Sequence, residues 1–440
     1  MNLTLLTLAM FGGLGVLLVV GVPFAFASGG VAVVTAVLLF GPDSLLLIVS
    51  RIYDMMGNHV LLSVPLFVLM GCFLERAGLA ERLFSVFYAW SGRVRGGLAI
   101  GVVLTGAVLA AMVGVVGAEV VTLGLVALPS MLKHGYDRRL SLGVICAAGS
   151  LGAMIPPSVV LIFYGLIANA SITELFLAAS LPGLLLALVY IVYILLLGLV
   201  SPQKMPVSPA EDRPASFREA LLLGKDVILP LGIIAGVLGV LYMGIATPTE
   251  AAALGTGFVV LVMIYERRFS FEVLLGAVKQ TSMTIGSVVW IFFGANALIS
   301  VYAFAGGLGF ITDVVTGIDL PPLGIIMVMV GIFFLLGLIV DWIAVAFLTL
   351  PVFIPIVSGL DFDLVWFGIV FCLAMQVSYL TPPFGPAVFY LRSVAPADVP
   401  IEEIYSGVWP FVLLQVLVIG LCIVFPALVL WLPETVMAGR

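Results

Sequence analysis

Apolar runs of membrane-spanning length follow one another along almost the whole chain, separated by short polar or charged stretches. A helix needs about 20 apolar residues to cross a bilayer, so the pattern predicts about ten to twelve helical crossings or half-crossings. One longer polar stretch, residues 201–219, contains four prolines among charged residues and divides the chain nearly in half. We interpret it as a linker between two halves.

Composition supports a polytopic membrane protein and excludes several other classes. The mean hydropathy is +1.33, and 9% of the 440 residues are charged, whereas soluble domains carry about 25% charged residues. The net charge is −6 without any basic patch, so no nucleic-acid partner is expected. With two histidines and four cysteines that lack CxxC spacing, a histidine-built metal site is not expected and the cysteines are interpreted as buried apolar residues.

Two double prolines, Pro156-Pro157 and Pro382-Pro383, interrupt long apolar runs, one in each half of the chain. Proline removes a backbone donor and clashes with the preceding turn, so each pair is expected to break a helix. In hydrocarbon, a broken helix is tolerated only where its freed backbone groups are buried in protein or line a polar cavity. Matched breaks in two halves are typical of secondary transporters whose ion and substrate site lies between two repeats.

Other landmarks recur in the same order and at nearly constant spacing in both halves. They are a proline after a first span (Pro23 and Pro248), an acid ten residues before a proline (Glu119 and Asp341), and a Gly-x-Asp segment beyond it (Gly135 and Gly359). We interpret these matches as an internal duplication. Placing the basic clusters in the cytoplasm then predicts two re-entrant hairpins of opposite orientation, residues 97–136 and 320–359, and both termini outside.

Two acids lie inside apolar runs, at or just past the predicted hairpin tips. Ionisable groups within a membrane are costly and are functional by default. Glu119 and Asp341 therefore have two interpretations, which stay open: each favours a cation site, or each caps the N-terminus of the second helix of its hairpin. Glu250, which follows Pro248 in Thr-Pro-Thr-Glu, is predicted to be a helix-start acid.

Glycines and hydroxyl groups near the tips and breaks complete the predicted site. Glycines permit tight reversals that turn carbonyl groups inward, and hard cations prefer such oxygen ligands. A serine in a membrane helix can instead simply hydrogen-bond to its own backbone, so this alternative also stays open. The helices after the breaks present positive N-terminal ends that suit an anionic group. The predicted substrate or ion site comprises Gly114, Gly117, Glu119, Ser150, Gly152, Pro156, Pro157, Ser158, Gly337, Asp341, Ser378, Thr381, Pro382 and Pro383. The predicted sodium ligands among them are Ser150, Ser158, Gly337, Asp341, Ser378 and Thr381.

Five motifs spread over essentially the whole chain carry a specific resemblance. They are the segment from Gly152 to Ser158 with the apolar run after it, Arg95-Gly-Gly-Leu-Ala, Gly135-Tyr-Asp-Arg, Thr247-Pro-Thr-Glu-Ala-Ala-Ala and Leu380-Thr-Pro-Pro-Phe-Gly. Together they resemble the large membrane subunit (DctM-like) of tripartite ATP-independent periplasmic (TRAP) transporters. The chain departs from the family at the first hairpin tip, where members often have Ser-Gly-Ser and this sequence runs from Val113 to Glu119 without a serine. No serine ligand is therefore carried over there.

The resemblance implies an all-α polytopic membrane protein with two inverted repeats, broken helices and an elevator arrangement of scaffold and transport domain. It implies sodium-driven import of an organic anion, such as a carboxylate, sugar acid or sulfonate, across the bacterial inner membrane. A small four-helix membrane subunit and a periplasmic substrate-binding protein are the implied partners. The expected divisions are 1–96 and 225–318 for scaffold and arm helices, 97–172 and 319–396 for the transport-domain hairpins and broken helices, 173–224 for a connecting helix and cytoplasmic linker, and 397–440 for a C-terminal membrane helix.

Two rival classes remain distinguishable from this interpretation. The main alternative is a stand-alone dicarboxylate or cation symporter or antiporter of inverted-repeat type, which works without a binding protein. A membrane enzyme is not expected. Asp54 and Asp341 faintly resemble the paired aspartates of intramembrane proteases, but Asp54 lies among polar residues and is interpreted as a surface group. An enzyme would also leave the matched double prolines unexplained.

Overall fold

The computed structural model describes residues 2–92, 94–114, 116–207, 224–317 and 319–438, and these ranges contain helices and no strand. Residues 208–223, which include much of the predicted linker, lie outside the described ranges. The first half contains α1 (Leu3–Val19), α2 (Phe24–Phe40), α3 (Leu45–Met56), α4 (Ser63–Arg76), α5 (Leu79–Ser91), α6 (Gly97–Val113), α7 (Val116–Lys133), α8 (Arg138–Ser150), α9 (Val159–Ala168) and α10 (Ile172–Val200). The second half contains α12 (Lys225–Tyr242), α13 (Pro248–Tyr265), α14 (Phe271–Phe304), α15 (Gly307–Thr316), α16 (Pro322–Gly337), α17 (Trp342–Gly359), α18 (Leu364–Leu380), α19 (Pro386–Val394), α20 (Ile401–Val424) and α21 (Ala427–Met437).

Membrane-spanning helices are plentiful by length and composition. In the described part of the chain, six helices are long and apolar enough to cross a bilayer, and eight further apolar helices are 10–17 residues long. Large apolar side chains such as Leu199, Tyr265 and Leu413 are exposed on the outer faces of these helices. Such faces match a hydrocarbon environment rather than water.

Two helix pairs occupy the ranges predicted for hairpins. The first pair, α6 and α7, turns at Gly114, whose φ of +64° lies in the left-handed region that glycine adopts without strain. The second pair, α16 and α17, turns between Gly337 and Asp341, and Asp341 forms the N-cap of α17. In each pair the two helices pack against each other.

Each double proline lies between two helices, as its chemistry predicts. The first break separates α8 and a short 3-10 turn (Leu151–Ala153) from α9, and Ser158 is extended just before α9 begins. The second break separates α18 from α19, and Thr381 is extended where α18 ends. The peptide bonds Pro156-Pro157 and Pro382-Pro383 are both cis.

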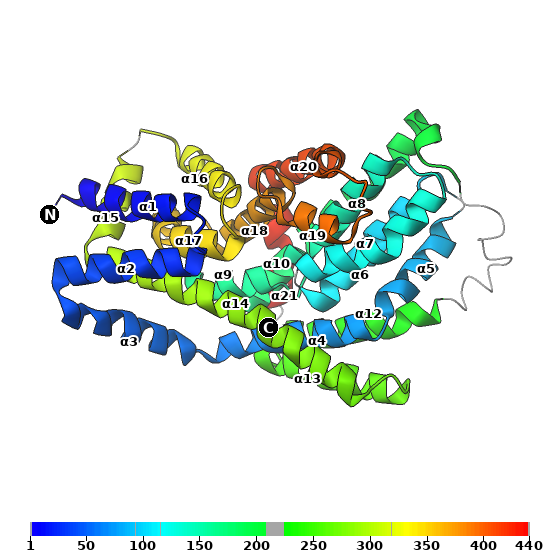
Figure 1. Cartoon of the computed structure of the whole chain (residues 1–440), viewed down its shortest axis with the longest axis horizontal. Coiled ribbons are helices and arrows are strands. Elements are labelled where there is room, and N and C mark those ends of the chain that lie inside the picture. Colours follow the sequence, from blue (N-terminus) through cyan, green and yellow to red (C-terminus); the bar gives the residue numbers. More distant parts are fainter. Residues whose placement is uncertain (1, 93, 115, 208–223, 318, 439–440) are drawn as a thin grey trace.

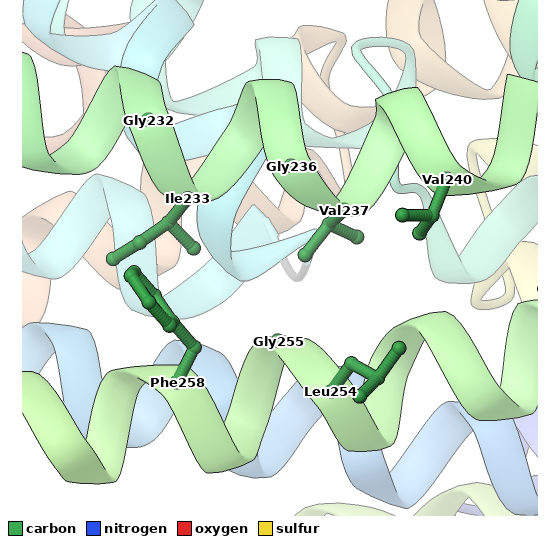
Figure 2. A pocket seen from close by; sticks show the side chains of 8 residues that line it. All are labelled: Gly232, Ile233, Gly236, Val237, Val240, Leu254, Gly255 and Phe258. Carbon is green, nitrogen blue, oxygen red and sulfur yellow. The ribbon is translucent and has the colours of Figure 1, made fainter.

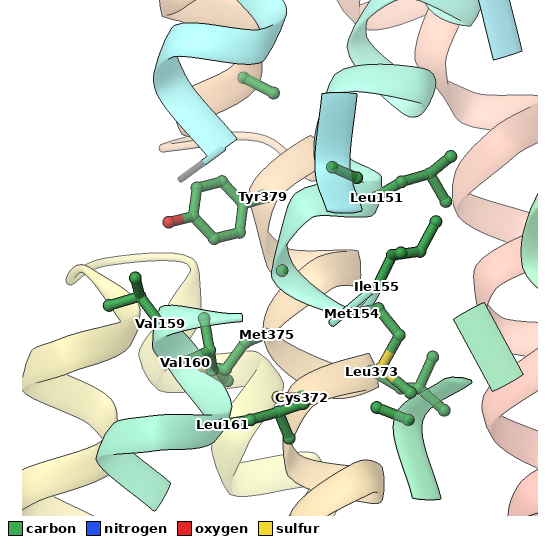
Figure 3. Packing of buried hydrophobic residues seen from close by; sticks show 14 of the residues in the cluster. Leu151, Met154, Ile155, Val159, Val160, Leu161, Cys372, Leu373, Met375 and Tyr379 are labelled. Atoms are coloured by element: carbon green, nitrogen blue, oxygen red, sulfur yellow. The ribbon is translucent and has the colours of Figure 1, made fainter. Parts of the chain in front are cut away.

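Two groups of helices pack side by side (Figure 1). The hairpins and broken helices, α6–α9 and α16–α20, form one group, which we call the hairpin core. Helices α2, α3, α4, α13 and α14 form the other, and we call it the α14 layer. Contacts of α4 with α6 and of α14 with α17 join the two groups. Within the hairpin core, Leu151, Met154, Ile155 and Leu373 pack beneath the first break (Figure 3).

Ion pairs join segments that are distant in sequence at the polar ends of the helices. Arg138, at the start of α8, pairs with Asp398 and lies 3.7 Å from Glu403 at the start of α20. The Arg138 guanidinium holds the pKa of the exposed Asp398 carboxyl below its usual value. Arg82 of α5 pairs with Glu266 after α13 at 3.1 Å. At the start of α13, Thr247 and Glu250 form a capping box, which confirms the predicted role of Glu250.

The closest helix crossing in the hairpin core depends on two glycines. A Cβ on Gly143 of α8 would overlap the carbonyl group of Gly407 in α20. Backbones approach this closely only where both helices lack side chains, which is a common arrangement between membrane helices. The crossing therefore holds α8, which leads into the first break, against α20.

Gly143→Ala is expected to destabilise the protein by about 1–3 kcal/mol, because the added methyl group has no space. Thermal denaturation of the purified protein, followed by tryptophan fluorescence, measures the change. Gly331→Ala in α16 is the matched control, since a Cβ there has no atom within 4 Å. Equal melting temperatures for the two variants would contradict this account of the α8–α20 crossing.

Candidate functional site

A cavity of about 550 Å³ lies where both hairpin tips and both helix breaks meet the α14 layer. The α14 layer contributes Glu75, Gln280, Thr284, Ser287, Val288 and Ile291, and the hairpin core contributes Gly114, Gly117, Ala118, Val121, Val159, Val160, Asp341, Trp342, Ile343, Tyr379 and Tyr390. Positions from six separate parts of the sequence thus come together around one space. Gly114, Gly117 and Asp341 are the predicted site residues that line it directly.

Asp341 lines the cavity and caps a helix at the same time. Its Oδ1 atom accepts a hydrogen bond from the backbone N–H of Ile343 at 3.0 Å, in the first turn of α17. A carboxylate at this position is favoured by the positive end of the helix. The capping interpretation is confirmed for Asp341, and the remaining carboxylate oxygen leaves the cation interpretation open.

Glu119 behaves differently from its counterpart. It lies in the first turn of α7, its side chain is 1% exposed, and neither carboxylate oxygen has a hydrogen-bond partner of good geometry. The backbone of Gly152 faces the carboxylate, and a Cβ at Gly152 would overlap it. The capping interpretation is therefore wrong for Glu119. Instead, an acid without a partner is buried against the first helix break.

The first hairpin tip rests on the first helix break. A Cβ at Gly114 would overlap the carbonyl oxygen of Pro157, and the N–H of Val159 lies 3.5 Å from the Gly114 carbonyl oxygen. The hydroxyl of Ser158 donates to the carbonyl of Ala153 at 2.6 Å. Gly114, Pro156, Pro157 and Ser158 are thus brought together, with the carbonyl groups of the break close to the tip.

The second half assembles a matching group. A Cβ at Gly337 would overlap the hydroxyl of Ser378, and a small cavity of about 10 Å³ is lined by Gly337, Asp341 and Ser378 among others. The hydroxyls of Ser378 and Thr381 donate to the carbonyls of Ala374 at 3.1 Å and Val377 at 2.7 Å. At the Pro382-Pro383 break, the Tyr405 hydroxyl donates to the Pro383 carbonyl at 2.9 Å.

Ser150 lies apart from these groups. Its hydroxyl donates to the Ala147 carbonyl at 2.8 Å and accepts from the side-chain amides of Gln376 at 3.4 Å and Gln415 at 3.3 Å. All three side chains are fully buried between α8, α18 and α20.

The four predicted hydroxyl ligands, Ser150, Ser158, Ser378 and Thr381, each donate to a nearby backbone carbonyl. This is the alternative that the sequence left open. Their oxygen lone pairs remain able to accept.

Several lining residues were missed by sequence reasoning. Glu75 stands next to Arg76 at the end of an apolar run, where it resembles an ordinary helix-end charge. Gln280 and Ser287 lie in a mixed segment without a motif. Tyr390 belongs to none of the motifs. Trp342 and Tyr379 adjoin the predicted site residues Asp341 and Ser378, which is the signal that could have found them.

A second cavity is of another kind. The groove between α12 and α13, of about 260 Å³, is lined by glycines and apolar side chains only (Figure 2). It offers no charge or hydrogen-bonding side chain to a polar solute. Gly232 and Gly236 face open space there.

Comparison with known proteins identifies the family. The tripartite ATP-independent periplasmic transporter family, DctM component, matches residues 11–428. The chain belongs to this family. The C4-dicarboxylate TRAP transporter large permease protein DctM of Pseudomonas aeruginosa is 31% identical over 92% of this chain and 93% of its own length. The ectoine/5-hydroxyectoine TRAP transporter large permease protein UehC of Ruegeria pomeroyi is 32% identical over 85% of this chain and 86% of its own length. The sialic acid TRAP transporter large permease protein SiaM of Vibrio cholerae is 28% identical over 97% of this chain and 98% of its own length.

The fold is shared with other transporters of known structure. The YdaH transporter of Alcanivorax borkumensis aligns with a TM-score of 0.61 and 17% identity, over 96% of this chain and 99% of that one. The resemblance read from the motifs is thus confirmed: the chain is a TRAP large permease, a multi-pass membrane protein whose relatives are permeases rather than enzymes.

Gly152→Ala is expected to destabilise the protein, because the added Cβ would displace the buried Glu119 carboxylate. Loss of about 1–3 kcal/mol in thermal denaturation is the expected size. The double variant Gly152→Ala/Glu119→Ala should recover most of that loss, since residues in direct contact are not additive. Additive losses in the double variant would contradict the contact.

Proposed function

We propose that this chain imports a small organic anion, driven by a sodium gradient, after a periplasmic substrate-binding protein has delivered the solute. The observation that carries the proposal is the cavity at which both hairpin tips and both helix breaks converge. Broken helices at membrane depth are tolerated where they line such a space, and transporters use them to bind ions and substrates. The solute's carboxylate, sugar-acid or sulfonate group would face the helix N-termini at the breaks.

Sodium ions are proposed to bind beside each tip and travel with the solute. On the second side, Gly337, Asp341 and Ser378 surround a small cavity, and Thr381 ends the helix next to it. On the first side, the carbonyl groups of the break lie against Gly114, with Ser158 adjacent. Glu119 places a buried carboxyl group without a hydrogen-bond partner beside them. Oxygen atoms of this kind suit a hard cation. Ser150 is the weakest of the proposed ligands, because it lies in the buried glutamine cluster.

An elevator motion is proposed for transport. The cavity lies between the α14 layer, which would be the scaffold, and the hairpin core, which would be the moving domain. Two pairs of hairpins and breaks, one from each half, support an origin as inverted repeats. At the contact, Glu75 of α4 accepts from Thr122 of α7 at 3.3 Å and from Gln280 of α14 at 3.4 Å. Few polar bonds would have to be exchanged when one group slides past the other.

The proposed setting follows from the family. The partners would be a small four-helix membrane subunit and a periplasmic substrate-binding protein, in the inner membrane, with both termini of this chain in the periplasm. The relatives' names mention C4-dicarboxylates, ectoine and sialic acid, all of which carry a carboxylate group.

A stand-alone symporter or antiporter is the second candidate, since YdaH-like transporters share the fold. Uptake in proteoliposomes with and without the binding protein separates the two. Transport of free solute at full rate without the binding protein would favour the stand-alone interpretation.

Sodium is expected to raise the melting temperature of the purified protein, with its small subunit, in a saturable way that potassium and choline do not reproduce. Binding to the folded state alone stabilises it by about 1.4 kcal/mol at tenfold saturation. Asp341→Ala and Thr381→Ala should each reduce the sodium-specific part. An identical response to the three salts would overturn sodium binding at these positions.

Glu119→Gln separates charge from shape at the first break. A buried carboxylate without a partner costs free energy, so the amide variant should melt at a higher temperature than the parent in sodium-free choline buffer. It should also gain less from added sodium. The parent and Glu119→Gln could instead have equal melting temperatures without sodium and equal increases on adding it. That result would argue against a role of this carboxylate in ion binding.

A further inference from the structure

The charges around the cavity are of one sign. Glu75 and Asp341 are its charged lining residues, and no described lysine, arginine or histidine lines it. Among the described residues, neither carboxylate takes part in an ion pair. Arg76, next to Glu75 in sequence, donates instead to Gln280 Oε1 at 3.2 Å and is exposed. A purely anionic solute would therefore meet two acids and no basic side chain among the described lining residues.

Glu75 is held in a fixed position facing this space. The Thr122 hydroxyl and the Gln280 side-chain amide donate to its two carboxylate oxygens, at 3.3 Å and 3.4 Å. The bonds come from α7 on one side and α14 on the other, so the acid is oriented between the two helix groups. It belongs to the α14 layer, whereas the predicted sodium ligands belong to the hairpin core, and it does not line the small cavity of Gly337 and Ser378.

Three aromatic side chains line the same cavity: Trp342, Tyr379 and Tyr390. The Tyr390 ring packs against Gly117, where a Cβ would lie 2.9 Å from the ring carbon Cζ. Figure 3 shows the Tyr379 ring directed away from the apolar cluster of Leu151 and Leu373, on the side where Val159 lies. Aromatic faces attract cations, most strongly those that carry a diffuse charge and little water.

We propose that the solute carried through this cavity is a zwitterion: besides its carboxylate it has a quaternary ammonium or amidinium group. That cationic group would lie among Trp342, Tyr379 and Tyr390, with Glu75 as its counter-ion. The carboxylate would face the start of α9, where Val159 and Val160 line the cavity and the helix presents its positive end. The proposal rests on the proposed function, keeps the carboxylate of its solute, and replaces the purely anionic solute by one with no net charge.

The competing explanation is that sodium ions alone neutralise the acids, so that a dianion fits equally well. Asp341 lies beside the proposed sodium ligands and would be neutralised in this way. Glu75 lies on the α14 layer, away from Gly337 and Ser378, and would keep its charge. The preference for a zwitterion over a dianion therefore depends on Glu75 and on the aromatic rings, and both can be changed by mutation.

The test measures thermal stabilisation of the purified protein with its small subunit, in saturating sodium, by single solutes at equal concentration. The zwitterionic probes are ectoine and glycine betaine, and the anionic probes are succinate, gluconate and isethionate. The largest shift is expected from a zwitterion. A larger shift from any anion, or no shift from either zwitterion, overturns the proposal. The sodium-specific shift without solute tests the proposed function separately, so the two failures are distinguishable.

Substitutions at Tyr390 and Glu75 test whether these residues bind the cationic group of the solute. Tyr390→Leu should weaken the apparent affinity for the stabilising zwitterion by about 2- to 30-fold, whereas Tyr390→Phe, which keeps the aromatic face, should retain it. Glu75→Gln should weaken zwitterion binding by about tenfold and leave the sodium-specific shift in place, which shows that the variant is folded. Unchanged zwitterion affinity in Glu75→Gln, or equal losses in the Leu and Phe variants of Tyr390, would overturn the assignment.

Discussion

The structure depends on one constraint, the cost of leaving backbone hydrogen-bonding groups unpaired in a low-dielectric interior. The two double prolines interrupt helices inside apolar surroundings, so something must cover the freed groups. The tip of the first hairpin covers the first break, where Gly114 lies on the carbonyl of Pro157. At the second break the Tyr405 hydroxyl donates to the Pro383 carbonyl, and Gly337 packs on Ser378 just before the break. The cavity forms where the hairpin tips and the helices beside the breaks reach the α14 layer.

The two acids near the tips occupy equivalent repeat positions but have different surroundings. The N-terminus of α17 stabilises the Asp341 carboxylate, because the carboxylate accepts a backbone hydrogen bond in the first turn of that helix. Glu119, in the first turn of α7, has no such partner and lies against the first break. In the proposed site, a cation bound at that position would pair with the buried carboxylate, which would couple ion binding to the stability of the first break. The absence of serine at this tip is consistent with a site that relies on a carboxylate and on carbonyl groups.

In the proposed site, solute recognition would be divided between the α14 layer and the hairpin core. Glu75 and Gln280 come from the α14 layer, whereas Asp341, Trp342, Tyr379 and Tyr390 come from the hairpin core. A solute that contacts both groups is held most tightly in one relative position of the two. Any sliding of the hairpin core would break the contacts to Glu75 while those to the aromatic rings move with the solute. The cavity therefore couples the chemistry of recognition to the proposed motion.

The sequence by itself determined the membrane class and the two helix breaks, because these follow from composition and from the local chemistry of proline. The ranges of the two hairpins followed from the distribution of basic residues, and the family from the motifs that resemble it. It could not decide which side chains reach the cavity. Helices such as α6 and α16 are apolar on every face, so no amphipathic pattern indicates which face is directed inward. Only the packing of α8 on α20 turns Ser150 toward Gln376 and Gln415, and only the approach of α4 and α14 brings Glu75 and Gln280 opposite Tyr390. Such contacts depend on the mutual orientation of helices far apart in sequence, which tertiary structure alone decides.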